Sequence, residues 1–477
     1  MPTEPAWRRW ARDARLDAVT GVLVVGFVTL RLVATLGRPV AFFNDSPSYF
    51  DFRVWGGVRF PVVTAMYAAV GDHRAIVDVQ AIGGALAWAA AAVIAGAVVE
   101  RRAVRYGFLV VVLLVGLTLP VTRVDNALLS ESVALSLTVL LVACMLRYAG
   151  RPTRAAAVAV GVVGAVWGLT RQNHAFVLVM GAVVLAVLGS LRDDRRRTWR
   201  LAAVLFAVGL LGVAMASSTS QIQQYNMAQI LVRRVFSDET REQWFLDHGM
   251  PTNGRELLIP PYENAFGDPA VELEDDPTFG PWLRDHFRNA YGRYLLTHPG
   301  YALGLPFGGD GGAIPLASGT TGYGASRAVL PTVVERAFWP QSAAGRGVVG
   351  LASLGIVVAG AVGAVRSRAR RWAFTGAVGI LLVGAANLAF VTHTAGWEYE
   401  RLLLGTGIAV RFALVWLLAV TVGGVSPPPP ASAEPAPSSR RRDATSTGPA
   451  ASPAPHTPPG PGSPGSSAVT AADPPTV

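Results

Sequence analysis

The sequence predicts an all-α membrane protein that crosses the bilayer about ten times, and three observations predict this fold class. Only 15% of the 477 residues are charged and 51% are hydrophobic, whereas about a quarter of the residues of a soluble protein are charged. Apolar runs of about 20 residues, each long enough to cross the bilayer as a helix, recur between Leu16 and Gly424. The net charge of +10 is concentrated between these runs, which is typical of membrane topology and speaks against nucleic-acid binding.

The predicted spans cover residues 17–37, 76–99, 105–121, 129–146, 154–170, 174–191, 201–217, 347–365, 373–392 and 402–424. We expect the first to remain as an uncleaved anchor, because its apolar part is too long for a signal peptide. Cys144, the only cysteine, lies inside the fourth run and therefore has no partner for an intrachain disulfide.

The positions of the basic residues predict the orientation of the spans. Arginines precede the first span and occupy every connection from an even-numbered span to the next one. Because cytoplasmic loops carry an excess of basic residues, both termini are predicted to lie in the cytoplasm. The expected location is the plasma membrane, with the chain crossing it many times.

The regions outside the spans differ in composition. Residues 1–16 form a cytoplasmic N-terminus, and residues 38–75 form the first external loop between spans of the 17–217 segment. Residues 218–346 mix aromatic and charged residues and are predicted to fold as an extracytoplasmic domain, followed by the last three spans within 347–425. Residues 426–477 hold 15 of the 33 prolines, a composition that predicts a disordered cytoplasmic tail.

Polar residues gather at the predicted external ends of the spans, where an outward-facing membrane enzyme needs them. Asp45 follows the first span closely, and aromatic neighbours on both sides can bury it and raise its pKa towards that of a base. A turn in which Asp45 bonds to the backbone of the Ser46-Pro47 step explains the same residues equally well. Glu131 at the start of the fourth span is consistent with a catalytic role or with helix capping.

These motifs, in their order along the chain, resemble the GT-C glycosyltransferases, integral membrane enzymes that use polyprenyl-phosphate sugars. The residues that carry the resemblance are Asp45-Ser46-x-x-Tyr49, Gly57 to Pro61, Gln80, Leu129-Ser130-Glu131-Ser132, and Trp397 to Arg401 followed by Arg411. In that family an aspartate of the first external loop is the usual catalytic base, which here implies Asp45. The resemblance implies an inverting hexosyl- or pentosyltransferase of the cell envelope with a GT-C-like fold. Its donor would be a polyprenyl-phosphate-linked sugar among the membrane lipids, and its acceptor a glycan, lipid or protein at the outer face.

Sugar transfer from a lipid phosphate also requires cations that stabilise the leaving group. Arg171, Arg401 and Arg411 are the predicted ligands of the donor phosphate. Two of them have alternatives. Arg171 and Arg401 can extend along the membrane interface, and Arg401 can also pair with Glu398 or Glu400 beside it.

Two arginines lie deep within predicted spans. Arg411 lies about ten residues into the last span, near mid-membrane at ~1.5 Å per residue, and Arg31 lies in the outer half of the first. An unpaired arginine at such depth is costly. We therefore expect each to have a partner, either a lipid phosphate or a carboxylate such as Glu131.

Several further residues are candidates for supporting roles at the same site. Asp125 and Glu131, together with Asp45, are possible ligands for a divalent cation such as Mg²⁺ or Mn²⁺, although no D-x-D or H-E-x-x-H spacing supports metal binding. His393 is a candidate contact for a carboxylate or phosphate, and Glu398 and Tyr49 complete the supporting set. Aromatic residues of the 218–346 region are candidates for stacking on sugars or, at helical spacing, for packing in a core: Trp244, Phe245, Trp282, Tyr291 and Tyr294.

Two other function classes remain open at this stage. A transporter or flippase of lipid-linked glycans would use the intramembrane arginines to carry a phosphate. It predicts inverted repeats and helices that are broken at mid-membrane, and the sequence shows neither. A non-catalytic envelope assembly protein would bind cell-wall polymer through its external domain and cytoplasmic partners through its tail.

Overall fold

The computed structural model describes residues 17–57, 59–191, 195–217, 226–254, 273, 275–308, 324–395 and 399–425. Of the described residues, 81% are helical; they contain no strand, only isolated bridges between Ala41 and Ala127 and between Val99 and Val425. Eight described helices are long and apolar enough to cross a membrane. The protein is therefore an all-α polytopic membrane protein, as the sequence predicts.

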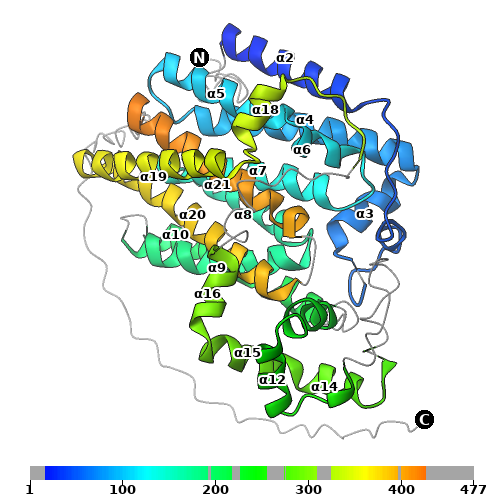
Figure 1. Cartoon of the computed structure of the whole chain (residues 1–477). Coiled ribbons are helices and arrows are strands. Elements are labelled where there is room, and N and C mark those ends of the chain that lie inside the picture. Colours follow the sequence, from blue (N-terminus) through cyan, green and yellow to red (C-terminus); the bar gives the residue numbers. More distant parts are fainter. Residues whose placement is uncertain are drawn as a thin grey trace, which may run out of the picture. The chain divides into compact units, whose positions relative to one another are not determined.

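The eight long helices each coincide with a predicted span. They are α2 (Ala18–Thr35), α4 (His73–Gly96), α7 (Glu131–Gly150), α9 (Gln172–Ser190), α10 (Arg195–Ser217), α19 (Ala343–Arg366), α20 (Arg368–Thr394) and α21 (Tyr399–Gly423) (Figure 1).

The other two predicted spans are also helical but differ in form. Helix α5 (Arg102–Leu117) breaks at Thr118, and the chain continues into α6 (Leu119–Thr122) and η2 (Arg123–Asn126) with a bend of 59°. Pro120 explains this break, because a proline cannot continue a helical hydrogen-bond ladder. Helix α8 (Arg154–Gly168) has only 15 residues. By length and composition the described helices thus supply eight spans, or nine when the bent pair is counted as one.

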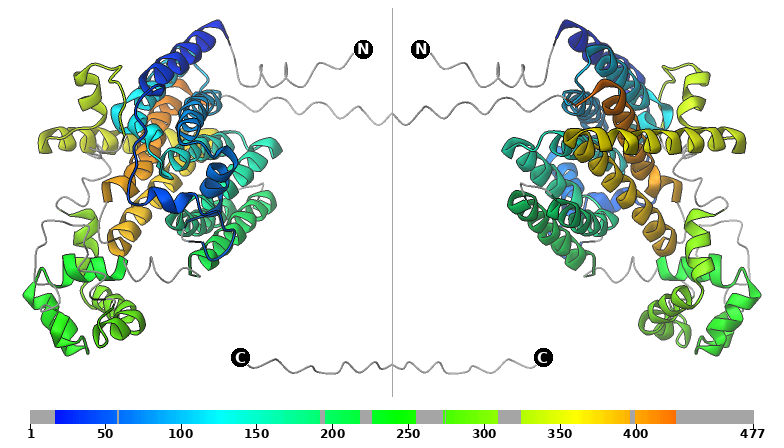
Figure 2. Two further views of the ribbon diagram at one scale, coloured as in Figure 1. Left: turned by 90° about the vertical axis from the view of Figure 1, so that its right-hand side faces the viewer. Right: turned by 90° about the vertical axis from the view of Figure 1, so that its left-hand side faces the viewer.

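Helix α7 lies at the centre of the bundle and contacts α4, α8, α20 and α21. Helices α9 and α10 run side by side (Figure 2), and glycines make their approach possible. A Cβ atom at Gly189 would lie 2.3 Å from Thr198, and one at Gly209 would lie 2.7 Å from Val179. Small residues at such positions let membrane helices pack closely.

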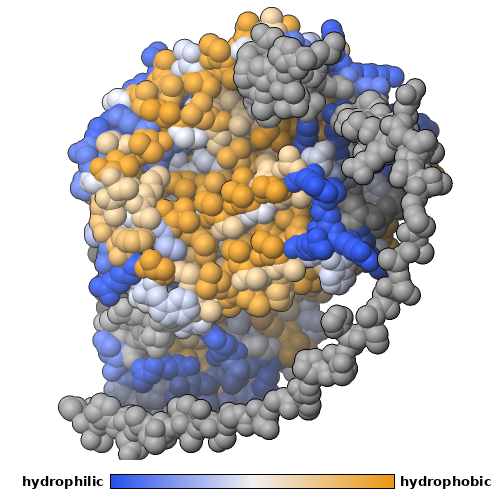
Figure 3. Space-filling model, turned by 180° about the vertical axis from the view of Figure 1, so that it is seen from behind, coloured by the Kyte–Doolittle hydropathy of each residue, from blue (hydrophilic) through white to orange (hydrophobic). Residues whose placement is uncertain are grey.

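A broad apolar surface covers one face of the molecule and has hydrophilic residues at its margins (Figure 3). Exposed hydrophobic side chains occur along α2, α8, α9, α10 and α19. On α19, Leu351 and Leu354 are 72% and 60% exposed. Apolar surface of this extent is costly in water and is expected of helices that face lipid.

The predicted extracytoplasmic region contains a small helical unit with its own hydrophobic core. Within residues 226–308 it comprises η3 (Leu231–Val235), α12 (Glu239–Asp247), η4 (Thr252–Gly254), α14 (Phe279–Asp285), α15 (Phe287–Thr297) and α16 (Pro299–Phe307). Phe245, Trp282, Tyr291 and Tyr294, named above for sugar stacking, are buried in this core, and Trp244 packs against it. Their burial favours the core-packing alternative for these side chains.

Residues 324–342 pack against the membrane helices. The Arg327 backbone N–H donates to Ala34 O, and the Trp339 indole N–H donates to Thr118 Oγ1 at 3.1 Å. In α18 (Thr332–Phe338), the Glu335 carboxylate accepts the Leu119 N–H at 3.0 Å and so caps α6. Residues 324–342 therefore belong with the membrane helices by their packing, whereas the sequence placed them in the predicted extracytoplasmic domain of residues 218–346. The proline-rich tail, residues 426–477, lies outside the described residues.

Candidate active site

Three helix N-termini meet at one position, where α7, α9 and α21 begin. Glu131, the first residue of α7, places Oε1 3.2 Å from Arg171 Nη1 and 3.0 Å from Arg401 Nε. Arg171 is the N-cap of α9, and neither it nor Ser130, the N-cap of α7, makes a side-chain capping bond. Helix N-termini carry partial positive charge and unpaired N–H groups. The position is therefore built to attract an anion.

Asp45 joins this group from the loop that follows α2. It precedes the short helix η1 (Ser46–Tyr49), and its side chain makes no capping bond to that helix. The carboxylate instead pairs with Arg59 at 2.8 Å and with Arg401 at 3.4 Å. With its side chain 36% exposed, Asp45 is the most accessible member of the group. Arg401 thus links Asp45 to Glu131.

The loop that carries Asp45 is fixed to the start of α7 through Tyr49. The buried Tyr49 Oη lies 3.1 Å from Ser130 Oγ. Arg59 lies over the Tyr49 ring at 4.8 Å and donates from Nε to Ser48 Oγ at 2.7 Å. Arg59 is a site residue that the sequence reasoning did not single out. The available signal was a cation in the same loop as the candidate base.

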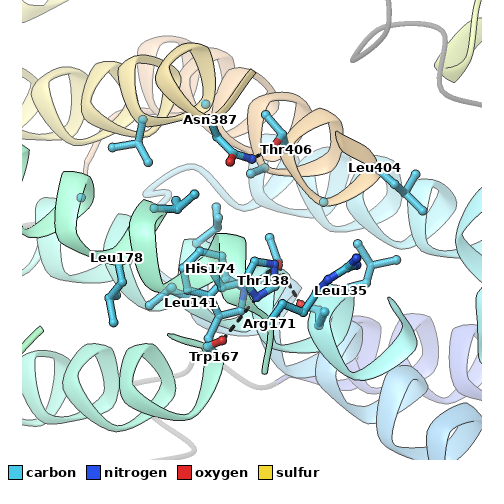
Figure 4. Close-up of a pocket in the computed structure, with 18 of the residues that line it drawn as sticks. Leu135, Thr138, Leu141, Trp167, Arg171, His174, Leu178, Asn387, Leu404 and Thr406 are labelled. Atoms are coloured by element: carbon cyan, nitrogen blue, oxygen red, sulfur yellow. Dashed lines mark hydrogen bonds between the residues drawn. The ribbon is translucent and has the colours of Figure 1, made fainter. Parts of the chain in front are cut away.

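Next to the Glu131 group, a cavity lined in part by Glu131, Arg171 and Arg401 extends between the helices (Figure 4). Its lining is largely apolar and comes from single faces of α7, α9, α20 and α21, with contributions from α8 and α10. Along α7 the lining runs from Glu131 to Met145, a distance of about 21 Å at 1.5 Å per residue. The cavity therefore has a charged end and a long apolar body.

Two hydrogen-bonded polar pairs lie on opposite walls of the cavity (Figure 4). On one side the Trp167 indole N–H donates to Thr138 Oγ1 at 2.8 Å, and the His174 ring stacks on Trp167 at 4.1 Å. On the other side Asn387 Nδ2 donates to Thr406 Oγ1 at 2.6 Å. The sequence reasoning missed these residues as cavity lining, because their convergence depends on helix rotation.

Asp125 lies apart from Asp45 and belongs to a second, buried pair. Its carboxylate accepts from Arg31 Nη2 at 2.8 Å and from Ser132 Oγ at 2.7 Å, and both members of the ion pair are 1% exposed. Arg31 also donates to Gly116 O. The partner expected for Arg31 is thus Asp125 and not Glu131, because a buried guanidinium in a span requires a counter-charge.

Arg411 also lies away from the group, although it is on the same helix as Arg401. Its guanidinium donates to Phe338 O at 2.9 and 3.0 Å and to Gly407 O at 2.9 Å, and it lies 4.0 Å from the Trp339 ring. It does not line the cavity below Glu131. Backbone carbonyls and an aromatic face thus surround the guanidinium of Arg411, which the sequence predicted to bind the donor phosphate.

The remaining supporting candidates have other positions. His393 lies 3.2 Å from Tyr291 Oη and 2.8 Å from Ala302 O, so it joins the end of α20 to α15 and α16. Arg234 strengthens the same junction through Tyr291 and Tyr399. Glu398 lies outside the described residues.

Within the described part of the chain, no three His, Cys, Asp or Glu side chains group closely enough to hold a metal ion. The carboxylates proposed as cation ligands are paired with arginine: Asp45 with Arg59 and Arg401, Glu131 with Arg171 and Arg401, and Asp125 with Arg31. Such a donor set suits an anion better than a cation.

Comparison of the chain with protein-family models, with curated proteins and with solved structures gave no match. Function is therefore inferred from the sequence of this chain and from the arrangement of its residues.

Proposed function

We propose that this protein is a membrane glycosyltransferase of the GT-C type. It transfers a sugar from a polyprenyl-phosphate donor to a cell-envelope acceptor at the extracytoplasmic face. In this proposal the chain crosses the plasma membrane ten times with both termini in the cytoplasm, as the arginine distribution predicts. The helical unit within residues 226–308 then lies outside the cell and shapes the acceptor side of the site.

The observation that carries the proposal is that the charged group lies at one end of the apolar cavity. Arg171, Arg401 and Glu131 line the charged end of a cavity whose body is apolar, and Asp45 pairs with Arg401 beside it. A lipid phosphate matches this distribution, because its chain requires apolar surroundings and its head group requires cations. A soluble sugar donor would leave the apolar body without a ligand.

In the proposed reaction, Asp45 accepts the proton of the acceptor hydroxyl as its oxygen bonds to the anomeric carbon. The bond between that carbon and the phosphate oxygen breaks, and the electron pair leaves with the lipid phosphate. Arg171 and Arg401, together with the N-termini of α7, α9 and α21, stabilise the charge that develops on this phosphate. Attack from the face opposite the phosphate inverts the anomeric configuration.

The test compares Asp45→Asn with Asp51→Asn, which removes an exposed carboxylate of the same loop that pairs with Arg53. A strain that lacks the protein should lose one envelope glycan, and analysis of that glycan identifies the sugar. Asp51→Asn should restore it. Asp45→Asn, at equal protein abundance, should reduce transfer by about 10²-fold or more, since a general base contributes about 10²–10⁴.

Full restoration by Asp45→Asn would remove Asp45 from the mechanism. If the purified wild-type protein moved polyprenyl phosphates across liposome bilayers without any sugar transfer, the transporter hypothesis would replace this one.

A further inference from the structure

Arg234 belongs to the small helical unit within residues 226–308, but its side chain reaches beyond that unit. It lies in η3, where Leu231 and Val235 are buried in the hydrophobic core of the unit. Arg234 itself is 6% exposed, and its Nη1 group donates to Tyr291 Oη of α15 at 3.3 Å. A guanidinium at this depth requires acceptors for its other N–H groups, and it finds two of them on the membrane helices.

These two acceptors lie at the end of α20 and at the start of α21. Arg234 Nη2 donates to Ala395 O at 3.0 Å, and Ala395 is the C-cap of α20. The same nitrogen donates to the hydroxyl group of Tyr399, the first residue of α21. Because the C-terminus of a helix carries partial negative charge, a guanidinium is a favourable partner for the end of α20. Arg234 thus joins the two helices across the connection between them.

The start of α21 also carries Arg401, two residues after Tyr399. The Arg401 guanidinium lies 3.0 Å from Glu131 Oε1 and 3.4 Å from Asp45 Oδ2, and it lines the charged end of the cavity. Since Tyr399 and Arg401 lie within one turn of the same helix, a displacement of Tyr399 also moves Arg401. Displacement of a site group by about 1 Å can cost about 10²-fold in activity.

The backbone of Arg234 is fixed on the side of the helical unit. Ser237 Oγ and Arg241 Nη1 both donate to Arg234 O, and the Arg241 guanidinium lies 4.3 Å from the centre of the Tyr301 ring. Helix α16, which contains Tyr301, packs against α20. A change in the way the unit packs on α20 would therefore reach the start of α21 through Arg234.

From these contacts we propose that Arg234 is a positioning residue. It holds the start of α21 so that Arg401 stays at the charged end of the cavity, and it makes phosphate binding depend on the docking of the helical unit. The inference rests on the proposed function, in which Arg401 binds the donor phosphate. Within the described part of the chain, Arg234 forms no hydrogen bond or ion pair with Arg401 or with the cavity lining, so its effect passes through α21.

The test measures the affinity of the purified full-length protein for farnesyl phosphate, a lipid phosphate with a short chain. Arg234→Gln should weaken binding about tenfold, on the order of one charge-assisted hydrogen bond. Tyr399→Phe removes only a hydroxyl group that Arg234 binds, so it endangers the fold less, and it should weaken binding by a smaller factor. Arg284→Gln, which replaces an exposed arginine of α14 in the same unit, should leave the affinity unchanged.

The variant Arg401→Gln distinguishes positioning from a general loss of structure. If Arg234 acts through Arg401, Arg234→Gln should cause no further loss of affinity in the Arg401→Gln background, and neither should Tyr399→Phe. Losses that multiply in the double variants would overturn the inference, as would wild-type affinity in both folded single variants. If wild type does not bind farnesyl phosphate, or if Arg401→Gln binds it as tightly as wild type, the proposed function fails and the inference fails with it.

Discussion

The buried pair of Arg31 and Asp125 gives the fold its strongest single test. Asp125→Asn keeps the shape of the side chain and removes its charge. The Arg31 guanidinium, 1% exposed and 2.8 Å from the carboxylate, would then have no counter-charge at this contact. The Ser132 hydroxyl would also lose its charged acceptor at 2.7 Å.

The expected cost follows from this burial. Removal of one partner from a buried ion pair typically costs about 3–5 kcal/mol, because the desolvated charge that remains is uncompensated. The ratio of folded to unfolded protein should therefore fall by a factor of roughly 10² to several thousand. The matched control is Asp78→Asn. It breaks the Arg74–Asp78 pair, whose side chains are 38% and 36% exposed, and should cost no more than about 0.5 kcal/mol.

Cys144 provides the assay. It is the only cysteine of the chain, and at 4% exposure on α7 it should react with a maleimide only when the bundle opens. Labelling in mixed micelles of increasing SDS content then measures the fraction unfolded for wild type, Asp125→Asn and Asp78→Asn on the same scale.

Two results would contradict the reasoning. One is an unfolding midpoint for Asp125→Asn no lower than that for Asp78→Asn. The other concerns the double variant Arg31→Met/Asp125→Leu, in which both charges are replaced by apolar side chains. Because that replacement is often neutral or stabilising, the double variant should be more stable than Asp125→Asn. A double variant that is less stable would show that the single substitution acts through packing.

Two further predictions concern the cavity and one end of α2. Gly181 lines the cavity, and a Cβ there would meet no atom within 4 Å. Gly181→Leu should therefore occupy part of the cavity and weaken the binding of a lipid phosphate such as farnesyl phosphate by tenfold or more, on the order of the burial energy of one leucine. Gly355→Leu, at an equally open position on exposed α19, should leave binding unchanged, and equal effects of the two would argue against a ligand in the cavity. At α2, the hydrogen bond from the Tyr106 hydroxyl holds the pKa of Asp17 at about 2. Since the pKa is lowered on folding, Asp17→Asn should cost about 1 kcal/mol near pH 7 after allowance for solvent screening, and this difference should vanish as pH falls from about 4 through about 2. A pH-independent difference in the SDS unfolding midpoint, followed by tryptophan fluorescence because maleimide does not label a protonated thiol at this pH, would contradict it.

Hydropathy predicts where helices lie but not where they break or how long they are. All ten predicted spans coincide with helices, because an apolar run in a bilayer has to satisfy its backbone internally. The break of α5 before Pro120 and the 15-residue length of α8 were not predicted, since a hydropathy window averages over backbone chemistry. Packing of residues 324–342 on the spans also escaped prediction, because it depends on single contacts such as that between Glu335 and Leu119.

The site residues divide in a similar way. Asp45, Glu131, Arg171 and Arg401 lie at chain positions where spans begin or end on one predicted side, and the structure joins them in one network of ion pairs. Asp125 meets the same criterion but lies elsewhere. Arg411, predicted near mid-membrane and assigned to the same site, also lies elsewhere. Sequence fixes the depth of a residue through its distance from the span end. The face on which it lies depends on helix rotation, which only packing determines.

Two arginines predicted to need partners, Arg31 and Arg411, differ in the structure from the two at the charged end of the cavity, Arg171 and Arg401. Arg31 has a carboxylate and a carbonyl as partners at almost complete burial, and Arg411 has two carbonyls and an aromatic ring. A phosphate could reach either only by displacing contacts that hold helices together. Arg171 and Arg401 instead share one oxygen of one carboxylate at the end of an open cavity. An anion that enters through the cavity would reach Arg171 and Arg401 at its charged end, and we therefore propose the ligand site there.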